Sequence, residues 1–462
     1  MFFQPQPLHF AGIGGIGMSG LAEIYHALGC RITGSDVKLS AITARLERLG
    51  IRVFEGHSSA NLPADATALI VTSALRADNP ELLEARRRGL PVVLRGELLA
   101  DLMQGRRGVA VGGSHGKTTT TSMLACITLE AGLDPTVFVG TLVPFLDGSN
   151  ARLGGDLLIT ECDESDGSFL ELAPVYSIIT NIDREHLDHY GSFENAKQAF
   201  VRFANRVAFL GAAIVCIDDV EVRSALPLIR RRTIPYGESP DAKLRLTDVI
   251  TDKEGSRFRA ALDGRALGEF TVNVLGRHNV LNAAAAIAVA IELDIPLERI
   301  RSGLAAYRGT GRRMEWKGSE RGITVMDDYG HHPTEVRATL AALRQTRPDR
   351  LVVLFQPHRY TRTKALMSEF ATAFLEADVV RIAEIYAASE TPIEGVNAQA
   401  LAEAIRRQGH PDCRFAGQLG EAAESLIAEL REGDLVLTLG AGSITQAGPM
   451  ILAGLRKESS DG

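Results

Sequence analysis

A glycine-rich loop between an apolar run and a helical pattern is the segment best suited to hold phosphate. It spans residues 112–119, reads GGSHGKTT and follows the run Val109–Val111. Glycines let several backbone N–H groups turn toward one anion, and the N-terminus of the following helix adds partial positive charge. Lys117 could reach the outer phosphates of a nucleotide, and the Thr118 hydroxyl could bind Mg²⁺. Because Val111 stands where the usual motif has its first glycine, the prediction depends on the flanking strand and helix.

Carboxylates and a histidine follow two further apolar runs. The run Leu157–Thr160 ends at Glu161, and an acidic cluster occupies 163–166. Ligands in open α/β sheets sit at the carboxyl ends of strands, and carboxylate oxygens suit a hard cation. Alone, the cluster is better explained as a solvated loop, but beside a phosphate loop Glu161 becomes the favoured Mg²⁺ ligand. His186 follows the run 177–181 and could hold a second cation or a phosphate, although a lone histidine is more often a packing or surface residue.

A second glycine motif lies near the start of the chain. Residues 12–17 read GIGGIG, after one predicted strand and before a helix, and Asp36 ends the next strand. By itself this pattern predicts a dinucleotide cofactor. The physical requirement is only a pyrophosphate at a helix N-terminus, so a nucleotide-diphosphate sugar fits equally well. Tight strand–helix packing is a third explanation, which three spaced glycines make less favoured.

Apolar runs and helical patterns alternate along all 462 residues. We expect helices over 18–28, 118–131 and 283–291. We expect strands over 8–13, 31–33, 68–72, 109–111, 157–160, 177–181, 212–217, 323–327, 351–355, 379–383 and 434–439. This alternation predicts parallel sheets with crossover helices. The length suggests about three domains, and the polar, glycine-containing stretch 104–108 is typical of a boundary.

Composition excludes several classes of protein. Lys and Arg number 50 against 57 Asp and Glu, so the chain has no broad basic footprint for nucleic acid. The five cysteines are scattered and form no C-x-x-C pair, which argues against a disulfide framework and fits a reducing cytosol. No signal-like segment opens the chain, and the most apolar helix is too short to span a bilayer. We expect a cytoplasmic monomer or homodimer that neither binds nucleic acid nor inserts into a membrane.

Taken in order, these and later motifs resemble the Mur ligase family over essentially the whole chain. Each motif alone is modest, but their ordered co-occurrence is highly specific. The motifs are GIGGIGMSG at 12–20, SHGKTTT at 114–120, ECDESDGSF at 161–169, HLD at 186–188, GRHNVLNA at 276–283, GRR at 311–313, DDYGHHPTE at 327–335 and QPHRYTRT at 356–363.

The resemblance implies an ATP-dependent ligase built from three α/β domains. Residues 1–106 would form a Rossmann-like domain for a UDP-sugar, 107–313 a central P-loop domain with a mostly parallel sheet, and 314–462 a Rossmann-like domain for the amino acid. The implied reaction joins L-alanine to the lactyl carboxylate of UDP-N-acetylmuramic acid through an acyl phosphate, giving ADP and phosphate. It belongs to peptidoglycan precursor synthesis and uses ATP and two Mg²⁺ ions.

The resemblance also implies roles for individual residues. The UDP-sugar would meet Gly14, Gly15, Ile16, Gly17, Met18, Ser19 and Asp36. ATP would meet Gly113, Ser114, His115, Gly116, Lys117, Thr118 and Thr119 at its phosphates, Asn279 and Asn282 at its adenine side, and Arg313 and Asp328 from the hinge and third domain. Thr118 and Glu161 would hold one Mg²⁺ and His186 the second. Tyr329, His331 and His358 would place the amino acid, and the expected catalytic residues are Lys117, His186, Arg359 and Arg362.

Two positions depart from the family pattern. Related ligases carry a carbamylated lysine a few turns after the histidine, whereas Phe200 stands at about that place and Lys197 one turn away. Family members that add alanine also tend to lack this lysine, but the ligand set of the second metal is left open. Cys162 stands where a small residue such as alanine is usual, and we expect it to be neutral packing.

Three alternatives compete with this interpretation. Within the family, a recycling ligase would attach a whole murein tripeptide, and the segment 356–363 and Tyr329 fit it less well. An NAD-dependent oxidoreductase would use the first glycine loop but would leave Lys117, Glu161 and His186 unexplained. A nucleotide-binding protein without enzymatic activity would need no second substrate domain.

Overall fold

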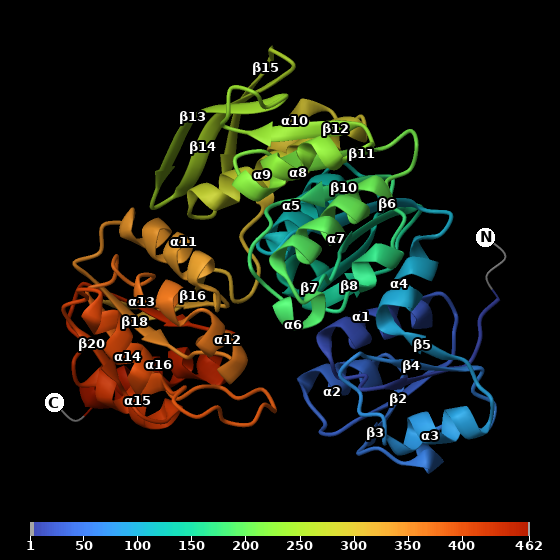
Figure 1. The fold of residues 1–462 in the computed structure, drawn as a ribbon, viewed down its shortest axis with the longest axis horizontal. Helices are drawn as coiled ribbons and strands as arrows, with labels where there is room; N and C mark the ends of the chain where they lie inside the picture. Colours follow the sequence, from blue (N-terminus) through green and yellow to red (C-terminus); the bar gives the residue numbers. More distant parts are fainter. Residues whose placement is uncertain (1–3, 461–462) are drawn as a thin grey trace. The chain divides into compact units, whose positions relative to one another are not determined.

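The computed structural model describes residues 4–460 and arranges them around three β-sheets (Figure 1). Each sheet is the centre of one α/β domain, so the predicted fold of three α/β domains is confirmed. The chain forms two compact units. The first runs through residue 249 and also includes 258–272 and 279–307, and the second includes 250–257, 273–278 and the chain from 308.

The first sheet has five parallel strands in the order β3-β2-β1-β4-β5. The strands are β1 (Leu8–Ala11), β2 (Ile32–Asp36), β3 (Arg52–Glu55), β4 (Ala68–Val71) and β5 (Val92–Leu94). The helices are α1 (Ile16–Ala27), α2 (Ala41–Arg48), α3 (Pro80–Arg87) and α4 (Arg95–Met103). The strand order reverses at β1, and ligands of such sheets bind where the order reverses. The glycine loop 12–17 leaves β1 at this point.

The central sheet has ten strands in the order β15-β14-β13-β12-β11-β10-β6-β9-β7-β8. The strands are β6 (Arg107–Gly112), β7 (Thr136–Val143), β8 (Ser149–Arg152), β9 (Leu157–Glu161), β10 (Tyr176–Ile179), β11 (Ala212–Cys216), β12 (Thr233–Gly237), β13 (Leu244–Asp252), β14 (Gly255–Leu262) and β15 (Arg265–Val272). The helices are α5 (Lys117–Glu130), α6 (Leu187–Tyr190), α7 (Phe193–Asn205), α8 (Val220–Ala225), α9 (Arg277–Glu292) and α10 (Leu297–Ala306). From β7 through β12 the neighbouring strands are parallel, so the loops after β6, β9 and β10 meet at one edge.

The third sheet has six strands in the order β16-β17-β21-β18-β19-β20, with β16 antiparallel and the others parallel. The strands are β16 (Glu315–Glu320), β17 (Ile323–Asp328), β18 (Arg350–Phe355), β19 (Val379–Ile382), β20 (Cys413–Phe415) and β21 (Asp434–Leu439). The helices are α11 (Pro333–Arg344), α12 (Tyr360–Ala365), α13 (Met367–Ala371), α14 (Ala398–Arg407), α15 (Leu419–Ile427) and α16 (Ala447–Ser460). In β18, Val353 joins the core on one face and Val352 the core on the other, which explains why this strand is a continuous apolar run.

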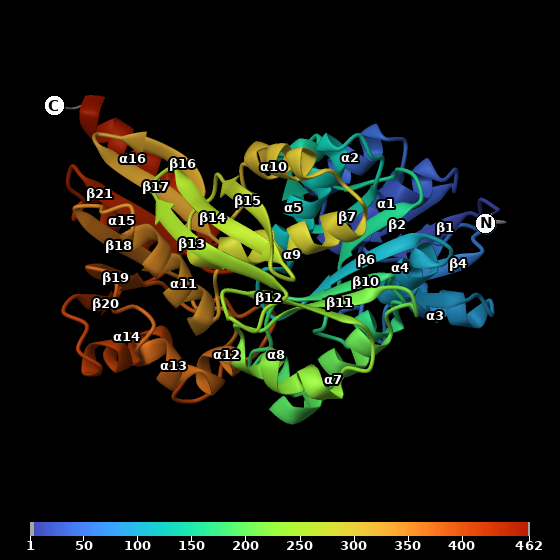
Figure 2. The same ribbon diagram turned by 90° about the horizontal axis from the view of Figure 1, so that it is seen from above.

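Several strands were not predicted from the sequence, namely β3, β5, β7, β8, β12 to β16 and β20. Strands β13, β14 and β15 lie side by side, as Figure 2 shows, and β16 adds an edge to the third sheet. Strands β13 and β14 carry charged residues at several exposed positions, and β16 is mostly polar, so these strands lack the apolar runs that marked the predicted strands. Among the helices of residues 4–460, none combines the length and the apolar character needed to cross a bilayer.

Candidate active site

The phosphate loop joins β6 to α5 through two glycines in left-handed or similar conformations. Gly113 has φ +126° and Gly116 has φ +85°. A Cβ atom would collide with the Thr180 hydroxyl at Gly113 and would lie 2.5 Å from Asn282 Oδ1 at Gly116. No side chain caps the start of α5, so its first-turn N–H groups face the loop without a capping acceptor. An anion at this position would satisfy them.

The loop after β10 fixes the shape of the phosphate loop. Asn181 Oδ1 accepts from the His115 N–H at 2.8 Å, and Asn181 Nδ2 donates to the His115 carbonyl at 3.0 Å. The Thr180 hydroxyl donates to the same carbonyl, and His115 Nε2 lies 2.9 Å from Asp183 Oδ2. The backbone and ring of His115 are therefore both bound by protein groups. Its predicted contact with ATP stays a prediction, and the structure adds a role in holding the loop.

Lys117 points back over the loop and is held by three oxygens. Its ammonium donates to Glu164 Oε1 at 2.8 Å and to the carbonyls of Gly113 and Ser114 at 2.6 and 3.0 Å. Burial acts to lower the pKa of Lys117, but the Glu164 carboxylate outweighs burial, so this pKa is raised and the ammonium stays charged. Burial raises the pKa of Glu164 to about 7, against the opposing effect of Lys117. A phosphate could replace Glu164 as the partner of the ammonium.

Thr118 and Glu161 offer neighbouring oxygens beside this ammonium. The Thr118 hydroxyl donates to Glu161 Oε2 at 2.8 Å. Gly140 in β7 leaves the space for this carboxylate, because a Cβ atom there would overlap Glu161 Oε1. Two neighbouring ligands of an octahedral Mg²⁺ stand about 2.9 Å apart, so the spacing and the donor types suit this cation. The residues fit a magnesium ion.

His186 lies in a group with two carboxylates. Its Nε2 is 3.8 Å from Glu164 Oε1 and 4.0 Å from Glu185 Oε2, and ligand atoms of all three residues lie within 4.8 Å of one another. Lys197 pairs instead with Glu221 at 2.9 Å, and Phe200 is buried against Phe169. The position where related ligases carry a modified lysine is therefore apolar core. The sequence did not indicate Glu164 or Glu185 as partners of His186.

Asn279 and Asn282 start α9 and are nearly fully buried. The Asn282 amide donates to Asn279 Oδ1 at 3.0 Å, and its oxygen abuts Gly116. The structure thus brings this pair to the phosphate loop, within the same compact unit. Their adenine contact stays a prediction.

The first glycine loop is tied down by Asp36 and approached by an arginine that the sequence did not single out. Gly14 N–H donates to Asp36 Oδ2 at 2.9 Å, so this carboxylate closes the loop onto β2. At Gly17, a Cβ atom would lie 3.0 Å from Arg95 Cδ and 3.2 Å from its Nη1. Arg95 Nη2 also donates to Asp163 Oδ2 at 2.9 Å. Arg95 therefore links the glycine loop to the acidic cluster after β9.

Both glycine loops belong to the first compact unit. Helix α1 packs on β7 and β8, because Gly20 leaves room for Asn150 and Phe138. The Asn150 amide donates to the Ile16 carbonyl at 2.7 Å. The predicted UDP-sugar and ATP loops therefore belong to one compact unit, in which α1 packs on β7 and β8.

A row of rings follows the carboxyl ends of β17 and β18 in the second unit. Centroid distances are 5.2 Å from Tyr329 to His331, 5.9 Å from His331 to His358 and 5.6 Å from His358 to Tyr386. Arg362 Nη1 donates to His358 Nδ1 at 3.1 Å. Burial, reinforced by Arg362, lowers the pKa of His358 to about 3, so the ring is neutral and accepts this bond. The structure brings Tyr329, His331, His358 and Arg362 together and adds Tyr386, while their contact with an amino acid stays a prediction.

Asp328 is buried at the end of β17. Its carboxylate accepts from Met314 N–H at 2.8 Å and from Gly330 N–H at 2.7 Å. Burial raises its pKa to about 6, although Arg313 acts to lower it. Arg312 and Arg313 place their guanidinium carbons 5.0 and 5.3 Å from the centre of the Tyr329 ring. The second unit therefore holds Arg313 and Asp328 close to the row of rings.

Asp328→Asn should change the pH dependence of stability. The unfolded carboxyl ionises near 3.8 and the folded one near 6, so stability present at low pH is lost as the pH rises through 6. An asparagine side chain does not ionise, so the variant does not lose stability in this pH range. We expect the free energy of unfolding of the native protein, relative to the variant, to fall by about 2 kcal/mol between pH 4.5 and 7.5. Urea unfolding of both proteins at the two pH values measures it, and a constant difference would contradict the buried ionisation.

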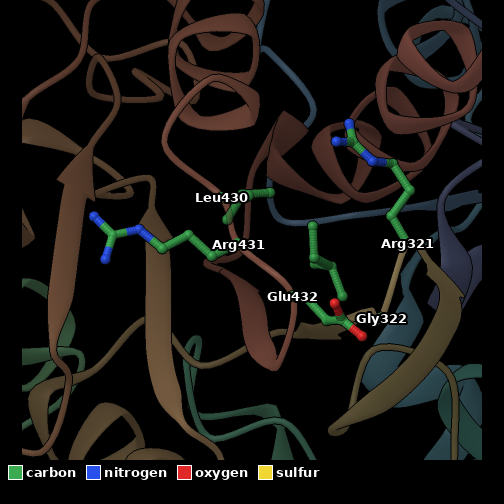
Figure 3. Close-up of a pocket in the computed structure, with 6 residues that line it drawn as sticks. Arg321, Gly322, Leu430, Arg431 and Glu432 are labelled. Atoms are coloured by element: carbon green, nitrogen blue, oxygen red, sulfur yellow. The ribbon is translucent and has the colours of Figure 1, made fainter. Parts of the chain in front are cut away.

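A hollow of about 480 Å³ lies elsewhere on the second unit (Figure 3). It is lined by Arg321, Gly322, Ile323, Leu430, Arg431 and Glu432. These residues surround the start of β17 and the turn before β21, at the amino ends of the strands. Figure 3 shows the side chains of Arg321 and Arg431 well apart, on either side of Leu430 and Glu432. Because ligands of such sheets bind at carboxyl ends, this hollow is separate from the row of rings.

Three family models match successive parts of the chain. They are "Mur ligase family, catalytic domain" at residues 7–107, "Mur ligase middle domain" at 111–290 and "Mur ligase, glutamate ligase domain" at 312–442. Together they cover most of the sequence and each of the three sheets.

Individual relatives match over nearly their full length. The UDP-N-acetylmuramate–L-alanine ligase of Solibacter usitatus is 56% identical, covering 99% of this chain and 97% of the relative, and that of Myxococcus xanthus is 52% identical, covering 97% and 95%. The crystal structure of the UDP-N-acetylmuramate–alanine ligase of Thermotoga maritima superposes with a TM-score of 0.83 at 30% identity, covering 98% of this chain and 99% of that one. By its sequence and its fold, this chain belongs to the Mur ligase family.

Proposed function

We propose that this protein is an ATP-dependent ligase that joins L-alanine to the lactyl carboxylate of UDP-N-acetylmuramic acid, giving ADP and phosphate. The observation that carries the proposal is the phosphate loop, where Lys117 is held charged beside the adjacent oxygens of Thr118 and Glu161. The near full-length similarity to ligases named for this reaction supports the choice of substrates.

The chemistry requires that a poor electrophile be activated. A carboxylate resists attack by an amine because its charge is delocalised, and transfer of the γ-phosphoryl group gives it a good leaving group. Such transfer depends mainly on positioning and neutralisation of charge. Lys117 would exchange Glu164 for the outer phosphates, while the N–H groups of α5 hold the inner ones. The amine of alanine then attacks the acyl phosphate, the C–O bond to phosphate breaks, and the amide forms.

Magnesium is the cofactor that we assign to the two oxygen groups. Thr118 and Glu161 would hold one ion, and Glu164, Glu185 and His186 the second. Bound there, the ions would neutralise negative charge on the phosphates.

The row of rings is our candidate for the amino-acid site. We propose that Tyr329, His331 and His358 position alanine. Arg359 and Arg362 would neutralise the negative charge of the acyl phosphate. His358 is neutral and accepts a bond from Arg362, so it orients that guanidinium without competing for its charge.

We propose that the three domains comprise residues 1–106, 107–313 and 314–462. The reaction uses nucleotide substrates, so we place it in the cytoplasm, with the protein as a monomer or homodimer.

Arg95→Met tests the assignment of the first glycine loop. The guanidinium lies against Gly17, where the diphosphate of the sugar nucleotide would bind. Loss of one charged hydrogen bond should raise the KM for UDP-N-acetylmuramic acid by about 10- to 100-fold and leave the KM for ATP within about twofold. Arg76→Met, which removes an exposed arginine of the same domain, serves as the control. An unchanged KM for the sugar nucleotide would show that Arg95 does not contribute to its binding.

A substrate panel tests the proposed function itself. Phosphate release should require ATP, Mg²⁺, UDP-N-acetylmuramic acid and an amino acid together, with L-alanine preferred to glycine and L-serine. Preference for the murein tripeptide would favour the recycling ligase. Phosphate release without any amine, or oxidation of reduced nicotinamide, would contradict the proposal.

A further inference from the structure

Two large apolar side chains stand almost fully in solvent at the loop between α7 and β11. Phe209 and Leu210 are each 85% exposed. The loop is nevertheless held in place, because Ala208 N–H donates to the Pro174 carbonyl and Gly211 N–H donates to the Ala208 carbonyl, both at 2.9 Å. The backbone therefore presents this pair of side chains to the solvent. Single exposed apolar residues need no explanation, whereas contiguous exposed apolar side chains point to an interaction site.

A second segment lies beside this loop and adds a third apolar residue. Asn205 at the end of α7 receives a hydrogen bond from Arg230 N–H at 2.6 Å and one from Arg231 Nε at 3.2 Å. The Asn205 amide donates to the Leu228 carbonyl at 3.2 Å, and Leu228 is 46% exposed. We call Phe209, Leu210 and Leu228 the apolar tip.

The apolar tip is accompanied by guanidinium groups without acidic partners. Arg206, Arg230 and Arg231 are exposed, and none of them forms an ion pair with another residue in the part of the chain that the structure describes. We call these three residues the basic rim. Arg206 donates to the backbone carbonyl of Glu171 and not to its carboxylate, and Glu292 is paired with Arg232. The basic rim therefore keeps an excess of positive charge, although the whole chain has a formal charge of −7.

The tip and rim lie at the amino ends of the central strands. Residue 211 leads into β11, and residue 232 leads into β12, whereas the phosphate loop leaves the carboxyl end of β6 (the connection from α7 to β11 can be followed in Figure 2). These strands are parallel, so the two features occupy opposite edges of the sheet. A surface bound at the tip would leave the phosphate loop open.

We propose that the apolar tip and basic rim dock this protein reversibly on an anionic lipid bilayer. Exposed aromatic and aliphatic side chains enter the headgroup boundary, and adjacent arginines pair with anionic headgroups. A second copy of the chain fits less well, because a two-fold contact would bring the unpaired guanidinium groups of both copies together. The protein would attach to one leaflet only, and this attachment does not depend on the roles proposed for the catalytic residues.

Vesicle sedimentation tests this docking with the full chain. The protein should sediment with phosphatidylcholine vesicles that contain phosphatidylglycerol, should not sediment with pure phosphatidylcholine, and should detach as salt is raised. The pair Arg230→Gln and Arg231→Gln should weaken partitioning by about 30-fold. The pair Phe209→Ser and Leu210→Ser should weaken it by at least about tenfold.

Controls separate docking from loss of the fold. Val220→Ser alters a 70% exposed apolar residue outside the tip and should leave partitioning unchanged. All variants should keep the native melting temperature and turnover. Equal partitioning of the tip, rim and control variants, or no binding to anionic vesicles, would overturn the proposal. So would a concentration-dependent dimer that the tip variant abolishes, since that result would assign the tip to a second copy.

Discussion

Lys117→Met should reduce phosphate release by at least about 1000-fold while leaving the affinity for UDP-N-acetylmuramic acid within about twofold. The lost ammonium is the charge that the structure holds over the phosphate loop, 2.8 Å from Glu164. The first glycine loop is built from different residues and should keep its ligand. The variant should still fold, because the pKa of Glu164 is already raised to about 7 and the carboxyl can take up a proton when its partner is gone.

Single-turnover phosphate release and calorimetric titration with the sugar nucleotide would measure the two effects of Lys117→Met. Lys243→Met removes an exposed lysine of the same central domain and should behave like the native protein. If the Lys117→Met variant no longer bound the sugar nucleotide but still bound ATP, the ligands assigned to the two glycine loops would have to be reversed.

Glu161→Gln should lower kcat by about 100-fold and raise the Mg²⁺ concentration needed for half-maximal activity. Glutamine keeps the shape of the side chain and one oxygen near the Thr118 hydroxyl, so the space beside Gly140 stays filled. What is lost is the negative charge that a hard cation prefers.

Magnesium titrations at saturating ATP would measure the effect of Glu161→Gln, and high Mg²⁺ should restore part of the rate. Glu130→Gln, at the exposed end of α5, is the matched control. Identical Mg²⁺ dependence in the native protein and Glu161→Gln would exclude Glu161 as a ligand.

The sequence predicted those site residues that follow directly from a strand and a short motif. Lys117 and Thr118 come after β6, Glu161 ends β9, and His186 follows β10. Because neighbouring parallel strands end at one edge of the sheet, local patterns were enough to bring these residues together.

The partners of these residues could not be predicted in the same way. Glu164 belongs to an acidic cluster that by itself resembles a solvated loop, yet the fold buries it against Lys117 and near His186. Arg95 lies far from Gly17 in the sequence and meets it only through the packing of α4 beside α1. Tyr386 joins His358 because β18 and β19 are neighbours. Each contact depends on tertiary structure, which no local pattern encodes.

The fold shows the same division. Most strands at the centres of the sheets were visible as apolar runs, and so the parallel sheets were predicted, although the largely buried strands β7 and β12 were missed. Strand β13 reads LRLTDVITD and alternates buried and exposed positions only in its first half. Its exposed half is polar and weakly periodic, so the sequence gives little signal for it.

The most direct test of activation through an acyl phosphate traces an oxygen atom of the lactyl carboxylate. UDP-N-acetylmuramic acid carrying ¹⁸O in its lactyl carboxylate would be converted with ATP and L-alanine, and the released phosphate analysed by mass spectrometry. We expect one ¹⁸O atom in the phosphate, because the carboxylate oxygen leaves with the phosphoryl group. Unlabelled phosphate, or label recovered in AMP, would contradict activation through an acyl phosphate.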